Sequence, residues 1–309
     1  MMLLLIVLKI YMKKTRNELF YKFFFGRFFT VRHLPTEKAK KILRHGLSAL
    51  RSRFRLQFRV GVTIILLSLL TFSCISTVHL PEENFIKNAL WKTVCTGIDY
   101  ALLEDLSLPL RCHLLRIDLS KTEASLFAVP GEEDTYSNCV LVNTTPFTKE
   151  KNPLGIHKLN GTTYSSPREK YASLAFYTSE NKLKAKILNS QDVFLTEEGD
   201  EYSSAFGGYY VILQNRIVKD SFIEHGDSRT AAGLSEDSSL LYLLCAEGEE
   251  LAFSAGLSYS QCARLFKALG CSDALEFDGG SSSRMYVNGS NVLGYSSPVN
   301  VPCMFGFKW

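Results

Sequence analysis

The densest group of residues that could carry out chemistry is the segment D-G-G-S-S-S-R at residues 278–284. Asp278 follows an apolar run, and the end of a strand is a usual place for a functional carboxylate. Gly279 and Gly280 let the backbone approach a ligand closely or adopt a positive φ angle. Successive amides in such a turn can together bind an anion. The segment predicts a functional carboxylate beside an anion-binding turn, although D-G-G is also a common plain turn.

The elements that must position this segment are mainly strands. Short apolar or alternating runs predict strands at residues 112–119, 124–129, 139–143, 171–177, 208–213, 240–245 and 274–277. The first two runs are typical of a hairpin-like unit that ends at Pro130-Gly131. Few helices separate the strands, so we expect a single α+β domain over residues 111–309 with a mixed or antiparallel sheet.

One helix is well marked. Ser258 can serve as its N-cap, and Gln261 three residues later completes a capping box. Apolar residues at positions 262, 265, 266 and 269 form one face, and Gly270 can end the helix in a left-handed conformation. Residues 74–110 are interpreted as a linker with a helical lead-in at 82–91.

The charge is divided unevenly along the 309 residues. The net charge is +4, but residues 1–59 carry 15 basic and two acidic groups, whereas residues 74–309 carry a net charge of −9. Such asymmetry is typical of a targeting segment or a membrane boundary. An acidic body also argues against a nucleic-acid partner, because phosphate contacts need a basic face.

The uncharged run at residues 60–72 has 13 residues, which is short for a membrane span of roughly 20. Basic residues precede it, as in a secretory signal, and Ser73-Cys74 resembles a bacterial lipobox. We therefore expect an exported protein of the cell envelope, lipidated at Cys74 or held by an uncleaved signal anchor at residues 60–73. The basic extension at 1–59 either lies on the inner membrane surface or reflects a misassigned start.

Composition excludes several classes of protein. An apolar fraction of 46% is too high for a disordered chain, and eight cysteines are too few for a disulfide-dense scaffold. The cysteines show no C-x-x-C spacing, so we expect no zinc site. No cofactor is firmly implied, and a divalent cation bound by Asp278 is left open.

Two further motifs accompany the D-G-G segment. S-R-T-A-A-G-L lies at residues 228–234, and D-A-L-E-F-D-G-G lies at 273–280, with the marked helix between them. Together they resemble the phosphodiester glycosidase family, whose pattern is P-R-T-A-x-G, a strand, a helix ending in L-G, and A-x-N-L-D-G-G-x-S-[ST]. V-N-G at 287–289 also matches. The resemblance covers residues 140–309.

The resemblance implies hydrolysis of a sugar-1-phosphodiester at its glycosyl C1–O bond, which gives a free sugar and a phosphomonoester. Arg229 would bind the anionic diester through its bidentate guanidinium. Asp278 would act as base or nucleophile towards the oxocarbenium-like transition state. Gly279, Gly280 and Ser282 would stabilise the phosphate leaving group.

Three further residues are candidates for the substrate site. Ser283 lies in the family's S-[ST] pair and is expected to line the substrate site. Arg284 binds phosphate or pairs with an acidic neighbour. Asn143, in a segment that looks like the family's N-x-x-(x)-F, contacts sugar hydroxyls or simply ends a strand.

The sequence departs from the family pattern at three places. Ser228 replaces a proline, Glu276 replaces an asparagine, and Thr144-Thr145-Pro146 replaces a glycine-rich turn. Glu276 lies two residues before Asp278, hence on the same strand face, where two carboxylates would raise one pKa. It is interpreted either as a second catalytic carboxylate or as a charge facing solvent at a strand edge.

Weaker candidates lie nearby. His225 and Asp227 could orient Arg229 or belong to a polar loop, whereas His157 and Asp273 are typical of loop and turn chemistry.

Two other functions remain open at this point. The chain could be a non-catalytic envelope lipoprotein that binds anionic glycans, which the Glu276 and Thr144-Thr145 departures favour. It could also be a general glycosidase or phosphodiesterase that acts on phosphoglycan polymers of the envelope.

Overall fold

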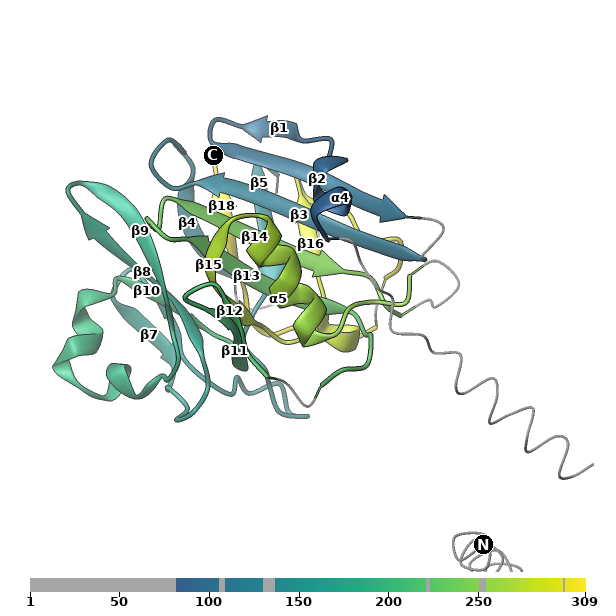
Figure 1. Ribbon diagram of the computed structural model, residues 1–309. Helices are drawn as coiled ribbons and strands as arrows, with labels where there is room; N and C mark the ends of the chain where they lie inside the picture. Colours follow the sequence, from purple (N-terminus) through teal and green to yellow (C-terminus); the bar gives the residue numbers. More distant parts are fainter. Residues whose placement is uncertain (1–81, 106–108, 130–136, 221–222, 250–253, 297) are drawn as a thin grey trace, which may run out of the picture. The chain divides into compact units, whose positions relative to one another are not determined.

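Figure 1 shows a computed structural model of the chain. It describes residues 82–105, 109–129, 137–220, 223–249, 254–296 and 298–309. The basic extension, the apolar run at 60–72 and Cys74 lie outside the described residues. Within the described ranges, no helix has the length and hydropathy that a membrane crossing needs.

The largest sheet has eight strands in the order β1-β2-β3-β14-β13-β15-β11-β12, and every pair in it is antiparallel. The bounds are β1 Lys92–Cys95, β2 Ile98–Asp105, β3 Leu110–Asp118, β11 Tyr210–Gln214, β12 Ile217–Val218, β13 Arg229–Ser235, β14 Leu240–Ala246 and β15 Cys271–Glu276. The central strands β13 and β14 are buried on both faces, so both faces of the sheet are covered by other parts of the domain.

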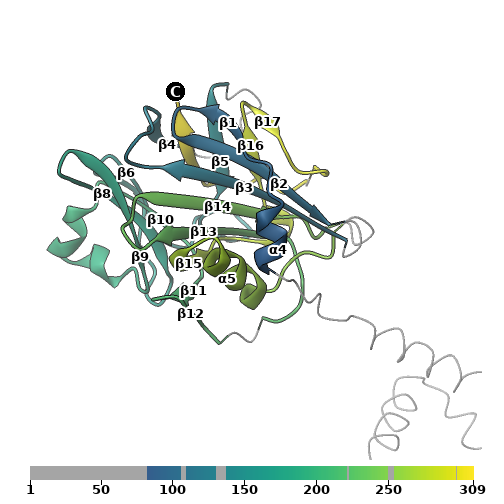
Figure 2. The same ribbon diagram turned by 45° about the horizontal axis from the view of Figure 1, so that its top comes forward.

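Two helices, α4 (Glu82–Lys87) and α5 (Tyr259–Ala268), cover one face of this sheet in Figures 1 and 2. The predicted capping box of α5 is confirmed: the Ser258 hydroxyl accepts a hydrogen bond from the Gln261 amide, and the Gln261 side chain accepts one from the Ser258 amide. Gly270 has a φ of +88°, as expected for a residue that ends a helix. Phe266 packs directly on Gly233 of β13, where a Cβ atom would collide with its ring.

Two five-stranded antiparallel sheets complete the fold (Figure 2). One has the order β7-β6-β10-β8-β9, with bounds β6 His157–Leu159, β7 Thr162–Ser165, β8 Ser173–Ser179, β9 Lys182–Leu188 and β10 Ser204–Gly207. The other has the order β17-β16-β5-β18-β4, with bounds β4 Ser125–Val129, β5 Cys139–Asn143, β16 Met285–Val287, β17 Ser290–Asn291 and β18 Met304–Lys308. Three short 3-10 helices are η1 Asp192–Leu195, η2 Glu197–Glu201 and η3 Gly280–Ser282.

The main core joins the three sheets. Phe206 of β10 and Phe305 of β18 stack with ring centroids 4.5 Å apart, and Leu275 of β15 belongs to the same buried cluster. Burial of side chains of this size is the main favourable term in folding. The expected α+β class, with antiparallel sheets and few helices, agrees with this arrangement.

Two expectations about the first strands of the domain are wrong. β3 and β4 do not form a hairpin-like unit, because β3 pairs with β2 and β14 whereas β4 pairs with β18 in another sheet. Residues 92–105, expected to belong to the linker, form β1 and β2 of the largest sheet. Local alternation predicts a strand but does not say which partner it pairs with.

Candidate active site

Asp278 lies directly beyond β15, and the end of β5 holds its backbone. Its amide donates to the carbonyl of Thr144 at 2.9 Å, and its carbonyl accepts from Nδ2 of Asn143 at 2.6 Å. The Phe277 amide bonds to Thr230 of β13 at 2.8 Å. The start of β13 and the ends of β5 and β15 therefore meet around Asp278.

The Asp278 carboxyl group is partly exposed and hydrogen-bonded. It accepts hydrogen bonds from the side chains of Ser282 and Tyr209 and from the Gly279 amide. Burial raises the pKa of Asp278 to about 6, and the three hydrogen bonds oppose that rise because they favour the charged form. Such a group can exchange a proton near neutral pH, as general acid–base chemistry requires.

Arg229 lies at the start of β13 with only 5% of its surface exposed. Its Nε donates to the Leu257 carbonyl at 2.8 Å, one Nη donates to the His225 carbonyl at 3.1 Å, and its guanidinium lies 4.8 Å from the ring centre of Tyr259. A Cβ atom on Gly279 would lie 3.6 Å from the other Nη. The guanidinium is therefore fixed in orientation next to the glycine that follows Asp278.

Glu276 is fully buried on β15, so its interpretation as a charge facing solvent is wrong. Among the described residues, its carboxyl oxygens have no hydrogen-bond partner apart from a weak interaction with the Cys262 thiol. Burial raises the pKa of Glu276 to about 8, although the charge of Arg229 and the thiol oppose the rise. The raised pKa favours the neutral form of Glu276 at pH 7, and Arg229 makes no ion pair with a carboxylate among the described residues.

Backbone hydrogen bonds hold the loop that follows Asp278. Gly280 has a φ of +58°, a conformation that favours glycine, and its amide donates to the Ser228 carbonyl at 2.8 Å. The Ser282 amide donates to the Gly279 carbonyl at 3.2 Å. These two amides are engaged within the protein, so the loop donors that reach the carboxylate are the Gly279 amide and the Ser282 hydroxyl.

Arg284 and Ser283 lie beneath this loop. Arg284 is 2% exposed, and its guanidinium donates to the carbonyls of Ser281, Ser283 and Val299 at 2.6–2.9 Å. Through these bonds Arg284 clamps the backbone on both sides of the loop. The Ser283 hydroxyl is buried and has no hydrogen-bond partner within the described part of the chain.

Asn143 joins three segments from the end of β5. Its side chain is fully buried; besides donating to Asp278, it accepts from the Thr230 hydroxyl at 2.7 Å and from the Arg284 amide at 2.8 Å. All these bonds lead to protein atoms. The geometry of Asn143 is that of a residue that positions Asp278.

The sequence profile of the family described as phosphodiester glycosidase matches residues 137–308, more than half of the chain. The chain belongs to the phosphodiester glycosidase family. No curated protein sequence matches the chain.

Solved structures show the same fold at low identity. The catalytic domain of zebrafish N-acetylglucosamine-1-phosphodiester alpha-N-acetylglucosaminidase, auto-inhibited by its pro-peptide, is 16% identical with a TM-score of 0.51, and the match covers 71% of this chain and 84% of that one. A hypothetical protein from Synechocystis is 13% identical with a TM-score of 0.51, and the match covers 71% of this chain and 64% of that one.

In this phosphodiester glycosidase family member, Tyr209 is a site residue that sequence reasoning missed. The structure brings its hydroxyl to Asp278, and burial raises the pKa of Tyr209, with the Asp278 charge acting in the same direction. A Cβ atom on Gly208 would lie 2.6 Å from the Glu276 carbonyl, so glycine lets Tyr209 approach the end of β15. The one available signal was the Gly207-Gly208 pair before a strand.

The structure places the four weaker sequence candidates in different surroundings. His225 orients Arg229 through its carbonyl, and the Asp227 carboxylate accepts from the Ser228 amide at 2.8 Å. His157 packs 5.2 Å from Phe206, and burial lowers its pKa to about 4. Asp273 accepts a hydrogen bond from the Asn215 amide at the turn between β11 and β12. No cluster of three or more potential metal ligands occurs in the ranges that the structure describes.

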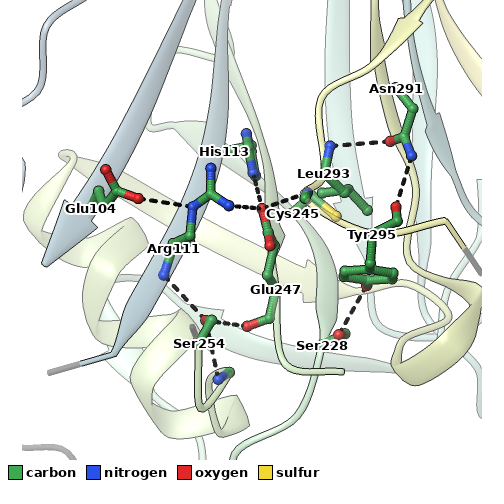
Figure 3. Close-up of polar contacts among 12 residues, drawn as sticks. Glu104, Arg111, His113, Ser228, Cys245, Glu247, Ser254, Asn291, Leu293 and Tyr295 are labelled. Atoms are coloured by element: carbon green, nitrogen blue, oxygen red, sulfur yellow. Dashed lines mark hydrogen bonds and ion pairs between the residues drawn. The ribbon is translucent and has the colours of Figure 1, made fainter. Parts of the chain in front are cut away.

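A buried polar network adjoins the Arg229 strand (Figure 3). Oε1 of Glu247 contacts His113 Nε2 at 2.7 Å and accepts from the Gly294 amide at 3.0 Å. The residue after Gly294 is Tyr295, and its hydroxyl donates to Ser228 Oγ at 3.0 Å. The network ties the segment after β17 to the residue that precedes Arg229.

Proposed function

We propose that the chain is a hydrolase that cleaves the glycosyl C1–O bond of a sugar-1-phosphodiester. The observation that supports this proposal is that Asp278 and Arg229 lie at adjoining strand ends, where Asp278 is a titratable carboxylate and backbone carbonyls fix the Arg229 guanidinium. A phosphodiester presents an electrophilic sugar carbon and an anionic phosphate, which these two groups complement. Membership of the phosphodiester glycosidase family supports the same reaction class.

In the proposed reaction, Arg229 binds the phosphate and disperses the charge that develops on it as the bond breaks. Asp278, as a carboxylate, either attacks C1 or removes a proton from the water that attacks C1. The C1–O bond breaks with its electron pair leaving on the phosphate oxygen. Water supplies the hydroxyl group of the free sugar and the proton of the phosphomonoester.

Glu276 is proposed to act through Arg229, because its carboxyl group is fully buried. A neutral Glu276 leaves the guanidinium with its full positive charge for the substrate. An ionised Glu276 would partly neutralise Arg229 and weaken binding of the diester. Asn143, Tyr209 and Ser282 are proposed to hold the Asp278 backbone and carboxylate in place.

The proposal is tested by incubating the wild-type protein with the methyl ester of N-acetylglucosamine 1-phosphate and related hexose esters. Free sugar and methyl phosphate support the proposal, whereas sugar 1-phosphate and methanol indicate cleavage on the phosphorus side and contradict it. Asp278→Asn should lower kcat by about 1000-fold or more while retaining the thermal unfolding transition. Turnover near that of the wild type would remove Asp278 from the mechanism.

We also propose that the enzyme acts outside the cytoplasm, attached to the membrane through Cys74 or through the run at residues 60–73. The charge division between residues 1–59 and 74–309 supports this orientation. Mass spectrometry of the membrane fraction tests it. A lipidated Cys74 peptide or an intact anchor supports the proposal, and a full-length chain found in the cytoplasm contradicts it.

A further inference from the structure

Four tyrosine rings form a continuous row beside Asp278, here called the tyrosine row. Tyr171 and Tyr209 meet edge to face with centroids 5.4 Å apart, and Tyr209 stacks on Tyr210 at 6.0 Å. Tyr210 in turn lies 6.2 Å from Tyr259. Tyr210 is 41% exposed, whereas Tyr171 and Tyr209 are partly exposed. The row therefore presents aromatic surface to solvent next to the proposed catalytic carboxylate.

An arginine lies at each end of the tyrosine row. The Arg168 guanidinium is 5.0 Å from the ring centre of Tyr171, and that of Arg229 is 4.8 Å from the ring centre of Tyr259. Arg168 is exposed, whereas Arg229 belongs to the site described above. Arg229 and Tyr259 are buried at one end of the row, so Arg168 is the cation that the row presents to solvent.

The far end of the row is held rigidly by a buried side chain. Gln191 is fully buried; its Oε1 accepts from the Arg168 amide at 2.8 Å, and its Nε2 donates to the Ala172 carbonyl at 2.9 Å. The Ala172 amide also donates to the Tyr209 carbonyl at 3.2 Å. The backbone that carries Arg168 and Tyr171 is thus fixed relative to Tyr209, and a preorganised surface loses little entropy when it binds a ligand.

We propose that the tyrosine row, with Arg168, binds a glycan whose sugars are joined by phosphodiesters. The inference rests on the proposed function and extends it, because the substrate becomes a chain rather than a single sugar ester. The electron-rich ring faces suit the C–H faces of sugars, and the guanidinium of Arg168 suits a second phosphate. One repeat occupies Asp278 and Arg229, and the neighbouring repeat lies along Tyr209 and Tyr171 towards Arg168.

A single-stranded nucleic acid also combines sugars, phosphates and stacking groups, but the observations favour a glycan. The row leads to a carboxylate suited to attack at a sugar carbon, which is the reaction of a glycosyl phosphodiester and not of a nucleic acid backbone. Binding of an oligonucleotide is therefore an outcome that the experiment must measure.

The test compares a synthetic tetramer of N-acetylglucosamine 1-phosphate repeats with the monomeric methyl ester, using the full chain. For the wild type we expect kcat/KM for the tetramer to exceed that for the monomer by about tenfold or more. Arg168→Ala and Tyr171→Ala should each reduce that ratio several-fold, whereas Tyr171→Phe should keep it because the ring remains. Tyr164→Ala, which removes a tyrosine that is 66% exposed outside the row, is the matched control and should keep the wild-type ratio.

Calorimetric binding of the tetramer to Asp278→Asn separates this inference from the proposed function. Tight binding that Arg168→Ala weakens supports the inference even if no variant hydrolyses the probe. Turnover of the monomer with an unchanged ratio in the Arg168 and Tyr171 variants would overturn the inference and leave the proposed function standing. Absence of tetramer binding, or equal binding of an oligothymidylate, would also overturn it.

Discussion

The side-chain amide of Asn143 donates a hydrogen bond of 2.6 Å to the backbone carbonyl of Asp278, although 135 positions separate the two residues. The bond links the end of β5 to the end of β15, which belong to different sheets. The side-chain oxygen of Asn143 accepts hydrogen bonds from the Thr230 hydroxyl and the Arg284 amide. One buried side chain therefore sets the relation between the proposed carboxylate, the strand of Arg229 and the loop after Asp278.

Asn143→Ala should destabilise the protein by about 2–4 kcal/mol, because it leaves several buried polar groups without partners. Urea denaturation followed by circular dichroism measures the loss. Asn152→Ala changes an exposed asparagine and should leave the free energy of unfolding within about 0.5 kcal/mol of the wild type. Equal stability of the two variants would show that Asn143 does not hold the site.

Activity should depend on pH in a bell shape. The rate should rise as Asp278 loses its proton near pH 6 and fall as Glu276 ionises near pH 8 and offsets the charge of Arg229. In kcat/KM profiles, Glu276→Gln should remove the alkaline limb and retain the acid limb. An alkaline limb that persists in this variant would contradict the role given to Glu276.

The stability of the folded protein should decrease as Glu276 ionises. The pKa of Glu276 is raised from 4.5 to about 8 in the folded protein, so folding is favoured at low pH and loses that advantage as pH rises from about 4.5 to 8. Thermal unfolding of Glu276→Gln should show a weaker decline over this window than the wild type. Parallel curves would show that Glu276 ionises in the folded protein as easily as in the unfolded one.

Tyr209→Phe removes a hydrogen bond that favours the charged form of Asp278. A hydrogen bond to a charge contributes about 1.5–3 kcal/mol, so the acid limb should move to higher pH by about one to two units. The pH profile of kcat/KM measures the shift, and Tyr164→Phe is the control. An unmoved acid limb in Tyr209→Phe would mean that the hydroxyl does not bind the carboxylate of Asp278.

Glu247→Gln should weaken the network in Figure 3. Burial alone would raise the pKa of Glu247, but hydrogen bonds from His113 and Gly294 outweigh it, so the net pKa is lowered. Glu247 thus stabilises the fold above pH 4.5, and this contribution disappears as pH falls through its lowered pKa. At pH 7 we expect a loss of about 2–4 kcal/mol, measured by urea denaturation, with convergence of the two proteins in acid.

The sequence predicted the elements that depend on local signals. The α5 capping box, the left-handed Gly270 and the strand before Asp278 follow from residues within a few positions of each other. Family motifs likewise pointed to residues 229 and 278. The pairing of β4 with β18 and the membership of β1 and β2 in the largest sheet could not be predicted, because they depend on long-range partners.

The same limit applies to the candidate site. Tyr209 lies 69 positions before Asp278, and only the fold brings its hydroxyl to the carboxylate. The burial of Glu276 and the clamping of backbone carbonyls by Arg284 depend on what packs around them, which no local pattern encodes. The sequence thus pointed to candidate residues, and the packing determines what each of them can contact.

The proposed reaction breaks the glycosyl C1–O bond, and the position of an oxygen isotope in the products reports which bond is broken. The wild-type protein would hydrolyse the methyl ester of N-acetylglucosamine 1-phosphate in heavy-oxygen water, and mass spectrometry would locate the label. Attack at C1 predicts unlabelled methyl phosphate, with the heavy oxygen on the sugar. Label in the phosphate product would place the attack on phosphorus and rule out the proposed cleavage at C1.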